Sequence, residues 1–303
     1  MRFGIGITHL LGPSPSAQDV IECARAAEAR EYRSIIVSDH VLTMDFDKAS
    51  YPAGTFPPSV PWFDPFVLLG VIAGATSTIR LETGIAVLPY RPAIQQAQAV
   101  ATLDFLSGGR FQYGVGLGWM QEEFEALDVP FAERGRRVDE HLEFMKLLWS
   151  GSDAGFHGEF TDLARGRLHP LPAQRPHPPI LIGGESPAAM RRVARHGNGF
   201  YINWKTLPEF KALIDDLTPL MEAAGRSVSD LHLQLAATDV EQVRNELAHL
   251  DAYEDEGLAE IVLAPVTGSV AEGLKVLHGI ADEFIDSPVD AGGTCSAVPG
   301  RIR

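Results

Sequence analysis

Two hydrophobic patterns alternate along the chain. Short runs of β-branched and other apolar residues are typical of strands that are buried on both faces of a parallel sheet. Each run is followed by a longer segment in which apolar residues recur every three or four positions, as in a helix that packs on one face. The first pattern predicts strands over residues 3–8, 34–38, 80–88, 111–116, 179–183, 199–203, 231–236 and 260–264.

The second pattern predicts a helix after every strand. Ser16 is an N-cap candidate, and Asp64 and Ser186 each precede a proline suited to the first position of a helix. Eight β–α units in series place the chain in the α/β class and favour a closed (β/α)8 TIM barrel over an open, doubly wound sheet. The predicted helices span residues 17–30, 64–76, 93–106, 134–149, 187–196, 207–224, 239–256 and 270–284.

Two connections are longer than a barrel needs. Residues 41–63, after the second strand, are rich in proline and aromatic side chains, and residues 150–178, before the fifth, are rich in Gly, His and Pro. Long loops in a compact domain tend to be functional, so both are expected around the mouth of the active site and not as a second domain. The interpretation is a single barrel over residues 1–286, followed by a flexible tail over residues 287–303.

Charge and targeting signals narrow the class of protein. The 303 residues carry a formal charge of −15, which disfavours nucleic acid and anionic membranes as partners. The first residues are interpreted as a buried strand and not as a signal peptide, and no apolar run is long enough to span a bilayer. Cys23 and Cys295 form no CxxC pair, so no disulfide framework or cysteine zinc site is indicated. The expectation is a soluble, cytoplasmic protein.

Candidate chemistry lies where strands end, because barrel active sites are built from the loops that follow the strands. The second strand ends in Asp39 and His40, an ionisable pair suited to proton transfer near neutral pH. The alternative is that Asp39 caps a loop and His40 is solvated. His141, on a predicted helix, is interpreted as a packing or surface residue.

Glycines mark three further strand ends. The fourth strand runs into residues 114–119 (GVGLGW), which suggests a bare backbone that a flat ligand approaches, with Trp119 as a wall, or a tight turn. Gly84, inside the third strand, suggests a bulge, and Arg91 beyond it either faces an anion or forms a structural ion pair. Gly183 and Gly184 open onto a helix N-terminus and suggest a phosphate site, although the charge of Glu185 favours a simple turn.

Together these motifs resemble the bacterial luciferase-like flavin and deazaflavin oxidoreductases. The resemblance is specific up to about residue 204 and generic beyond it. It implies a (β/α)8 barrel with insertions, which agrees with the count of eight units. The stretches that carry it are residues 38–41 (SDHV), 62–65 (WFDP), 80–92 (RLETGIAVLPYRP), 114–124 (GVGLGWMQEEF), 130–137 (PFAERGRR) and 179–184 (PILIGG).

The resemblance also implies roles for individual residues. Asp39 and His40 lie near the reactive edge of the tricyclic ring and act in catalysis, and a non-prolyl cis peptide behind the ring falls at Gly84-Ile85. A carboxylate that follows the glycine-rich strand in sugar-phosphate dehydrogenases of the family is Trp119 here, which disfavours glucose-6-phosphate and suggests a more apolar pocket. The residues implied in cofactor binding are Asp39, Gly84, Ile85, Gly116, Leu117, Gly118, Trp119, Gly183, Gly184 and Glu185.

The Ser-Asp-His form at residues 38–40 looks like the F420 branch of the family, whereas FMN-using members more often have Glu-His-His there. The resulting hypothesis is an F420-dependent oxidoreductase that moves a hydride between the deazaflavin and a carbonyl, an alcohol or an activated alkene. An FMN-dependent monooxygenase fed by a separate reductase, and a flavin- or deazaflavin-binding protein without catalysis, remain alternatives. The family implies a homodimer and a small-molecule substrate, and no metal site is indicated.

Overall fold

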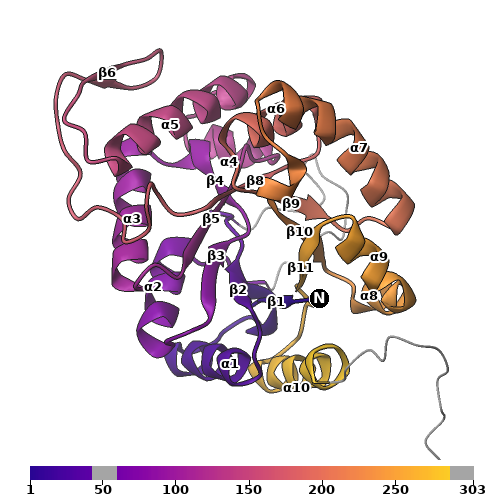
Figure 1. Ribbon diagram of the computed structural model, residues 1–303. Helices are drawn as coiled ribbons and strands as arrows, with labels where there is room; N and C mark the ends of the chain where they lie inside the picture. Colours follow the sequence, from indigo (N-terminus) through magenta and orange to yellow (C-terminus); the bar gives the residue numbers. More distant parts are fainter. Residues whose placement is uncertain (43–59, 287–303) are drawn as a thin grey trace, which may run out of the picture.

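A parallel β-barrel forms the centre of the protein. The computed structural model describes residues 1–42 and 60–286, and every strand of the barrel pairs in parallel with its neighbours. β3, at one end of the sheet order, also pairs with β5, the strand next to the other end, which closes the ring and confirms the predicted TIM barrel (Figure 1). The strands are β1 (Phe3–Gly6), β2 (Ser34–Val37), β3 (Arg80–Thr83), β4 (Ala86–Val87), β5 (Phe111–Gly116), β8 (Ile180–Gly183), β9 (Gly199–Asn203), β10 (His232–Ala237) and β11 (Leu258–Leu263).

The predicted third strand is divided into β3 and β4. Against β5, Glu82 pairs with Gln112 and Ala86 with Val115, so four steps along one strand face three along the other. This is the one-residue excess of a β-bulge, and it falls at Gly84 and Ile85 as the sequence predicts. The bulge lies near the C-terminal end of the strand, where it faces the barrel mouth.

Helices surround the barrel, in the order in which they follow the strands (Figure 1). Their starts follow the capping signals: Ser16 and Asp19 form a capping box, and the side chains of Asp64 and Ser186 accept backbone N–H groups in the first turn. The main helices are α1 (Ala17–Ala29), α2 (Pro65–Ala75), α3 (Ala93–Leu106), α5 (Arg134–Trp149), α6 (Pro187–His196), α7 (Leu207–Ala223), α8 (Val240–Asn245), α9 (Leu250–Asp255) and α10 (Val270–Ile280).

Three details differ from the sequence predictions. The helix predicted over residues 239–256 is wrong as a single element, because a 3-10 turn at Leu247–His249 separates α8 from α9. A short helix, α4 (Gln121–Ala126), and a hairpin of β6 (Phe156–His157) and β7 (Asp162–Leu163) were not predicted, since elements this short show little periodicity. The predicted tail and most of the connection over residues 41–63 lie outside the described residues.

Polar residues fill the base of the barrel, at the N-terminal ends of the strands. Glu82 is fully buried and accepts hydrogen bonds from Gln112 Nε2 (3.0 Å) and Gln234 Nε2 (3.3 Å). Burial, together with the nearby charge of Glu260, raises the pKa of Glu82 well above its usual value. The base is thus a layer of polar side chains that are hydrogen-bonded to one another. Among the described residues, no helix has the length and apolar character needed to cross a membrane.

Candidate active site

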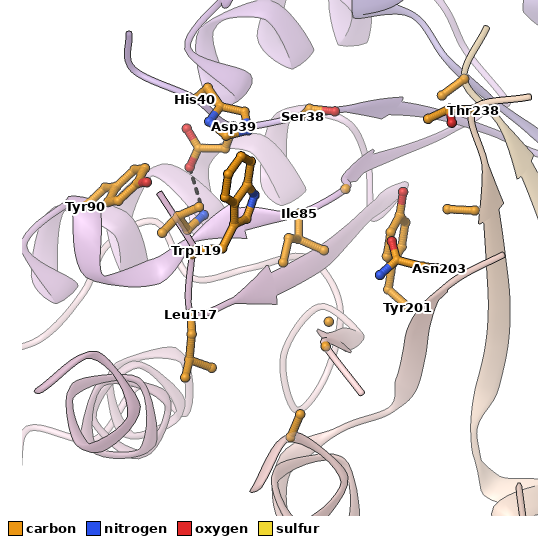
Figure 2. A pocket seen from close by; sticks show the side chains of 18 of the residues that line it. Ser38, Asp39, His40, Ile85, Tyr90, Leu117, Trp119, Tyr201, Asn203 and Thr238 are labelled. Atoms are coloured by element: carbon orange, nitrogen blue, oxygen red, sulfur yellow. Dashed lines mark hydrogen bonds between the residues drawn. The ribbon is translucent and has the colours of Figure 1, made fainter. Parts of the chain in front are cut away.

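A cavity of about 410 Å³ opens at the C-terminal ends of the strands (Figure 2). Its walls come from the loops after β2, β3, β5, β8, β9, β10 and β11, which is where a TIM barrel places its active site. Most of the residues that the sequence singled out lie together in this wall. They are Asp39, His40, Gly84, Ile85, Leu117, Gly118, Trp119, Gly183 and Gly184.

Gly116 and Glu185 are not among the lining residues. A Cβ atom on Gly116 would lie 2.0 Å from Ile85 Cδ1, so this glycine makes room for the side chain of the bulge. The Glu185 carboxylate turns to the neighbouring strand end, where it accepts from the Asn203 N–H (2.9 Å) and pairs with Lys205 Nζ (2.7 Å). Its negative charge is therefore compensated locally, beside the glycine loop.

The bulge brings bare backbone to the cavity wall. The peptide bond between Gly84 and Ile85 is cis, as expected from the family resemblance. The Gly84 N–H donates to the Val37 carbonyl (2.9 Å), which holds the bulge against β2. The Ile85 side chain lies in the cavity wall between Trp119, on the loop after β5, and Tyr201, on β9 (Figure 2).

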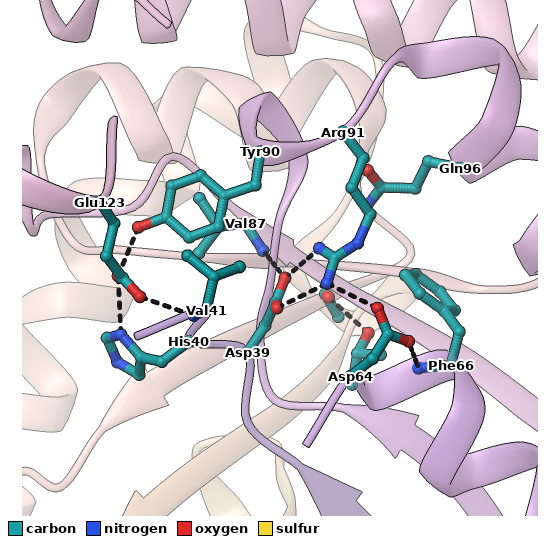
Figure 3. Close-up of polar contacts among 12 residues, drawn as sticks. Asp39, His40, Val41, Asp64, Phe66, Val87, Tyr90, Arg91, Gln96 and Glu123 are labelled. Carbon is teal, nitrogen blue, oxygen red and sulfur yellow. Dashed lines mark hydrogen bonds and ion pairs between the residues drawn. The ribbon is translucent and has the colours of Figure 1, made fainter. Parts of the chain in front are cut away.

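A buried carboxylate orients the imidazole of His40. His40 Nδ1 lies 2.8 Å from Glu123 Oε2, and Glu123 comes from α4, which follows β5 (Figure 3). An ionised carboxylate only accepts hydrogen bonds, so Nδ1 carries the hydrogen. In the neutral ring Nε2 is then the basic nitrogen, and in the imidazolium Nε2 is a donor.

Several donors keep Glu123 ionised although its side chain is fully buried. Burial by itself would raise the pKa of this carboxyl, but hydrogen bonds from His40, from the Tyr90 hydroxyl (2.7 Å) and from the Val41 N–H (2.6 Å) leave the pKa lowered. The Tyr90 hydroxyl donates here, since burial and Glu123 raise its own pKa. Glu123 is therefore an anion at neutral pH.

Asp39 is held by an arginine. Its carboxylate accepts from both terminal nitrogens of Arg91, at 2.7 and 2.9 Å, and from the Val87 N–H at 2.9 Å (Figure 3). Of the two interpretations of Arg91, the structural ion pair is thus confirmed. The Asp39 side chain is fully buried, so it fixes the strand end that carries His40 against the loop after β4.

Aromatic rings and a second histidine line the mouth. The His40 ring lies 4.6 Å from the ring of Trp62 and 5.8 Å from that of Trp119, measured between centroids. The ring of His9 lies 5.9 Å from the ring of Trp62, again between centroids. His9 is buried, and this burial lowers its pKa. Trp119 remains 44% exposed, so it presents an apolar face at the entrance.

The opposite side of the cavity has the features of an anion site. Gly184 has φ +100°, a conformation that side-chain-bearing residues rarely adopt. The chain then enters α6, and Ser186 and Ala189 at its N-terminus line the cavity with Gly183 and Gly184. Backbone N–H groups and the helix dipole favour a phosphate or carboxylate there.

Sequence reasoning did not assign roles to several lining or supporting residues. Glu123 lies 83 positions after His40, and Tyr90 joins it from another loop. Trp62 and Glu123 both fall inside the stretches that carry the family resemblance, and this was the signal in the sequence that could have identified them. Their spacing along the chain does not indicate that they contact His40. His9, Tyr201, Asn203 and Thr238 also line the cavity.

The model of the luciferase-like monooxygenase family matches residues 1–249 of this chain. The chain belongs to that family. A luciferase-like relative from Mycobacterium tuberculosis, an uncharacterized protein, is 33% identical over 293 residues, which cover 93% of this chain and 98% of the relative. The predicted resemblance is thereby confirmed.

Luciferase-like relatives with stated activities use two different cofactors. An F420-dependent glucose-6-phosphate dehydrogenase of Nakamurella multipartita is 30% identical over 76% of this chain and 65% of its own length. An FMNH2-dependent dimethylsulfone monooxygenase of Pseudomonas putida is 33% identical over 61% of this chain and 52% of its own length. A solved F420-dependent secondary alcohol dehydrogenase, 17% identical, shares the fold with a TM-score of 0.71 over 93% of this chain and 98% of that one.

Proposed function

We propose that this protein is an F420-dependent oxidoreductase that transfers a hydride between the deazaflavin and a small carbonyl, alcohol or activated alkene. The observation that carries the proposal is the pair of His40 and Glu123, which presents a proton-transfer group at the cavity beside the Gly84-Ile85 bulge. The F420-dependent relative, which is similar over three quarters of the chain, supports the choice of cofactor.

The residues present fit a flat ring with a phosphate-bearing chain. The bulge and Gly183 leave backbone without side chains along the wall, and the cavity of about 410 Å³ has the size of a small-molecule site. Gly184 and the N-terminus of α6 provide the anion site at one side. An acidic protein can thus hold an anionic cofactor, because local N–H groups and not the overall charge would bind it.

When bound, the deazaflavin supplies or accepts the hydride. His40 handles the accompanying proton: as an imidazolium it gives the Nε2 proton to a carbonyl oxygen, and as a neutral ring it takes the proton of an alcohol at the same atom. Glu123 stabilises the imidazolium and holds the ring in the tautomer with hydrogen on Nδ1. Trp62 and Trp119 keep water from the imidazole and favour an apolar substrate.

Titration of the purified chain with F420 and, separately, with FMN tests the cofactor. Deazaflavin fluorescence and calorimetry should show saturable F420 binding at micromolar concentrations, with FMN at least tenfold weaker. Tight FMN binding without F420 binding would defeat the proposal. Turnover is then sought with F420 and a panel of alcohols, ketones and enones, and a complete lack of turnover would favour a binding protein without catalysis.

An FMN-dependent monooxygenase is the second candidate. The observation in its favour is the dimethylsulfone monooxygenase, whose matched region is 33% identical to this chain. Such an enzyme needs a separate reductase to supply reduced FMN. Substrate-dependent oxygen uptake in the presence of reduced FMN would select this function, and oxygen uptake that does not respond to any substrate would reject it.

We also propose that the protein forms a homodimer through α2 and α3. These adjacent helices expose Val67, Val71, Phe105 and Leu106, with 41–73% of each residue accessible, around an apolar groove. Contiguous apolar patches of this kind mark protein interfaces, and a face that meets its own copy closes a twofold dimer. Light scattering should give twice the chain mass for the wild type and the chain mass for a Val67→Glu/Leu106→Glu variant; a monomeric wild type would reject the dimer.

A further inference from the structure

A second cavity lies beside the active site, on the far side of the 3-10 turn Leu88–Tyr90. It has a volume of about 480 Å³ and lies between this turn, the start of α3, helix α5 and the β6–β7 hairpin. We name it the hairpin cavity. Tyr90 is the one residue that lines both this cavity and the active-site cavity, among the residues described. The two spaces are therefore distinct and share one wall.

An unsatisfied imidazole lines the hairpin cavity. His141, on α5, is only 5% exposed, and its Nδ1 has no hydrogen-bond partner within residues 1–42 and 60–286. Burial lowers the pKa of His141 to about 4, so the ring is neutral and offers one donor and one acceptor. Nδ1 itself is shielded from the cavity, so the nitrogen that a ligand can reach is Nε2, which likewise makes no hydrogen bond within the described residues.

The charges around the cavity are already neutralised. Arg91 is paired with Asp39 and Asp64, and Arg137 donates to Glu133 at 2.9 and 3.2 Å while its guanidinium lies 4.4 Å from the ring of Phe160. Neither arginine offers an unpaired charge to an anion. Asp162, also in the wall, is paired with His157 (2.6 Å). The rest of the wall mixes polar groups with the apolar side chains of Ile94, Leu127, Val129, Phe144 and Leu163.

We propose that the hairpin cavity is a second small-molecule site, and that it takes an uncharged molecule with an apolar ring and one hydroxyl, such as a simple phenol. The apolar side chains of the wall and the Phe160 ring pack against the ring of the ligand. Its hydroxyl pairs with His141 Nε2, since a hydroxyl can donate to or accept from either form of a neutral imidazole. This proposal does not depend on the proposed hydride transfer.

The shared wall places such a ligand next to the acid/base pair. Tyr90 lines the hairpin cavity, and its hydroxyl donates a hydrogen bond to Glu123, which holds His40. Arg91 borders the same cavity and holds Asp39. A molecule in the hairpin cavity would therefore contact Tyr90 and Arg91. Tyr90 holds His40 through Glu123, and Arg91 holds Asp39.

The test compares p-cresol with toluene, two probes that differ by the hydroxyl. Calorimetry and ligand-observed NMR on the purified full-length chain should show saturable p-cresol binding in the millimolar range or tighter. Toluene should bind about tenfold more weakly, the difference expected for one hydrogen bond. Equal affinities for the two probes, or no saturable binding of p-cresol, would overturn the proposal.

Two variants locate the binding site. His141→Phe keeps the ring and removes its nitrogens, so p-cresol should lose its tenfold advantage while toluene binding stays unchanged. Ile94→Trp, at an exposed position on the rim, should fill the cavity and weaken both probes at least tenfold. If Ile94→Trp folds with the wild-type circular dichroism spectrum and binds p-cresol normally, the probe is bound elsewhere and the proposal is wrong.

Discussion

A histidine and a buried glutamate meet at each end of the barrel. At the mouth, His40 Nδ1 lies 2.8 Å from Glu123, and at the base, His232 Nε2 lies 2.9 Å from Glu260. Both carboxylates are fully buried. The partners around them differ: Glu260 also accepts from Arg33 Nε (3.1 Å) and the Ser34 hydroxyl, whereas Glu123 accepts from Tyr90 and backbone N–H groups.

That difference separates a structural pair from one suited to proton transfer. Arg33 is a permanent cation, so Glu260 remains compensated whether or not His232 carries a proton. Among the described residues, the ion-pair partner of Glu123 is His40, so the stabilisation of the imidazolium falls on this one carboxylate. The mouth pair borders the cavity that gathers the other candidate site residues, whereas His232 borders a separate cavity of about 400 Å³ that contains none of them. A histidine next to a glutamate is therefore not enough to indicate proton transfer. The further partner of the glutamate, Arg33 or Tyr90, and the residues around the adjoining cavity decide the role of each pair.

The largest expected effect comes from removing the two histidines in turn. His40→Ala should lower F420-dependent turnover by roughly 10² or more, with cofactor affinity within about tenfold of the wild type. His232→Ala, the matched control at the base, should leave turnover within about twofold, because His232 does not line the candidate site. Deazaflavin absorbance follows both reactions. Equal losses in the two variants would remove the functional distinction between the ends.

Glu123→Gln should lower kcat by about tenfold without changing the affinity for the cofactor. The amide keeps the size of the side chain but loses its charge, and its nitrogen can donate to Nδ1, which favours the wrong tautomer of His40. Tyr90→Phe, which removes one donor to Glu123 and leaves the charge, should cost about two- to threefold. Steady-state kinetics decide the case: a higher KM at constant kcat would speak against a positioning role.

Gly184→Ala should weaken cofactor binding by about tenfold, because alanine resists the positive φ on which the anion loop depends. The loss should be specific to the phosphate. A phosphate-free form of the chromophore, titrated in parallel, should bind the variant and the wild type within about twofold of each other. If both ligands lose affinity equally, the loop shapes the ring site and does not hold the phosphate.

The smallest effect concerns stability at the base. Glu28 is partly buried, which would raise its pKa, but hydrogen bonds from residues 77–79 outweigh burial and lower the pKa from 4.5 to about 2. Its contribution to stability is therefore present above pH 4.5 and lost as the pH falls towards 2. Glu28→Gln should lower Tm by about 2–3 °C at pH 7, with no change in turnover, and the difference should shrink near pH 2.5. A constant difference across this range would contradict the assigned pKa.

The strands and helices of the barrel were predictable because the pattern of apolar residues along the chain follows which positions are buried. Strands buried on both faces appear as short apolar runs, so the predicted bounds at residues 111–116 and 199–203 are those observed. The break between α8 and α9 was missed because Val243, Leu250 and Tyr253 are all buried at a spacing that a continuous helix would also give.

The site was predictable only where its residues are neighbours in sequence. Asp39 and His40 end one strand, and the glycines of the other loops end theirs, so the barrel brings them together. Glu123, Arg91 and Tyr90 act through contacts between different loops. The periodicity of apolar residues cannot predict such a contact. For the same reason it could not predict that the Glu185 carboxylate binds Asn203 and Lys205 and does not line the cavity.

Arg91 has one consequence for how this scaffold can change. Its guanidinium binds Asp39, just before the long connection over residues 41–63, and also Asp64 Oδ2 (3.0 Å), just after it. Both ends of the connection are thus tied to one side chain on the rigid turn after β4. Closing a loop at fixed ends costs little more when the loop is longer. The chain between Leu42 and Val60 can therefore change in length at little cost, while Asp39, His40 and Trp62 keep their contacts.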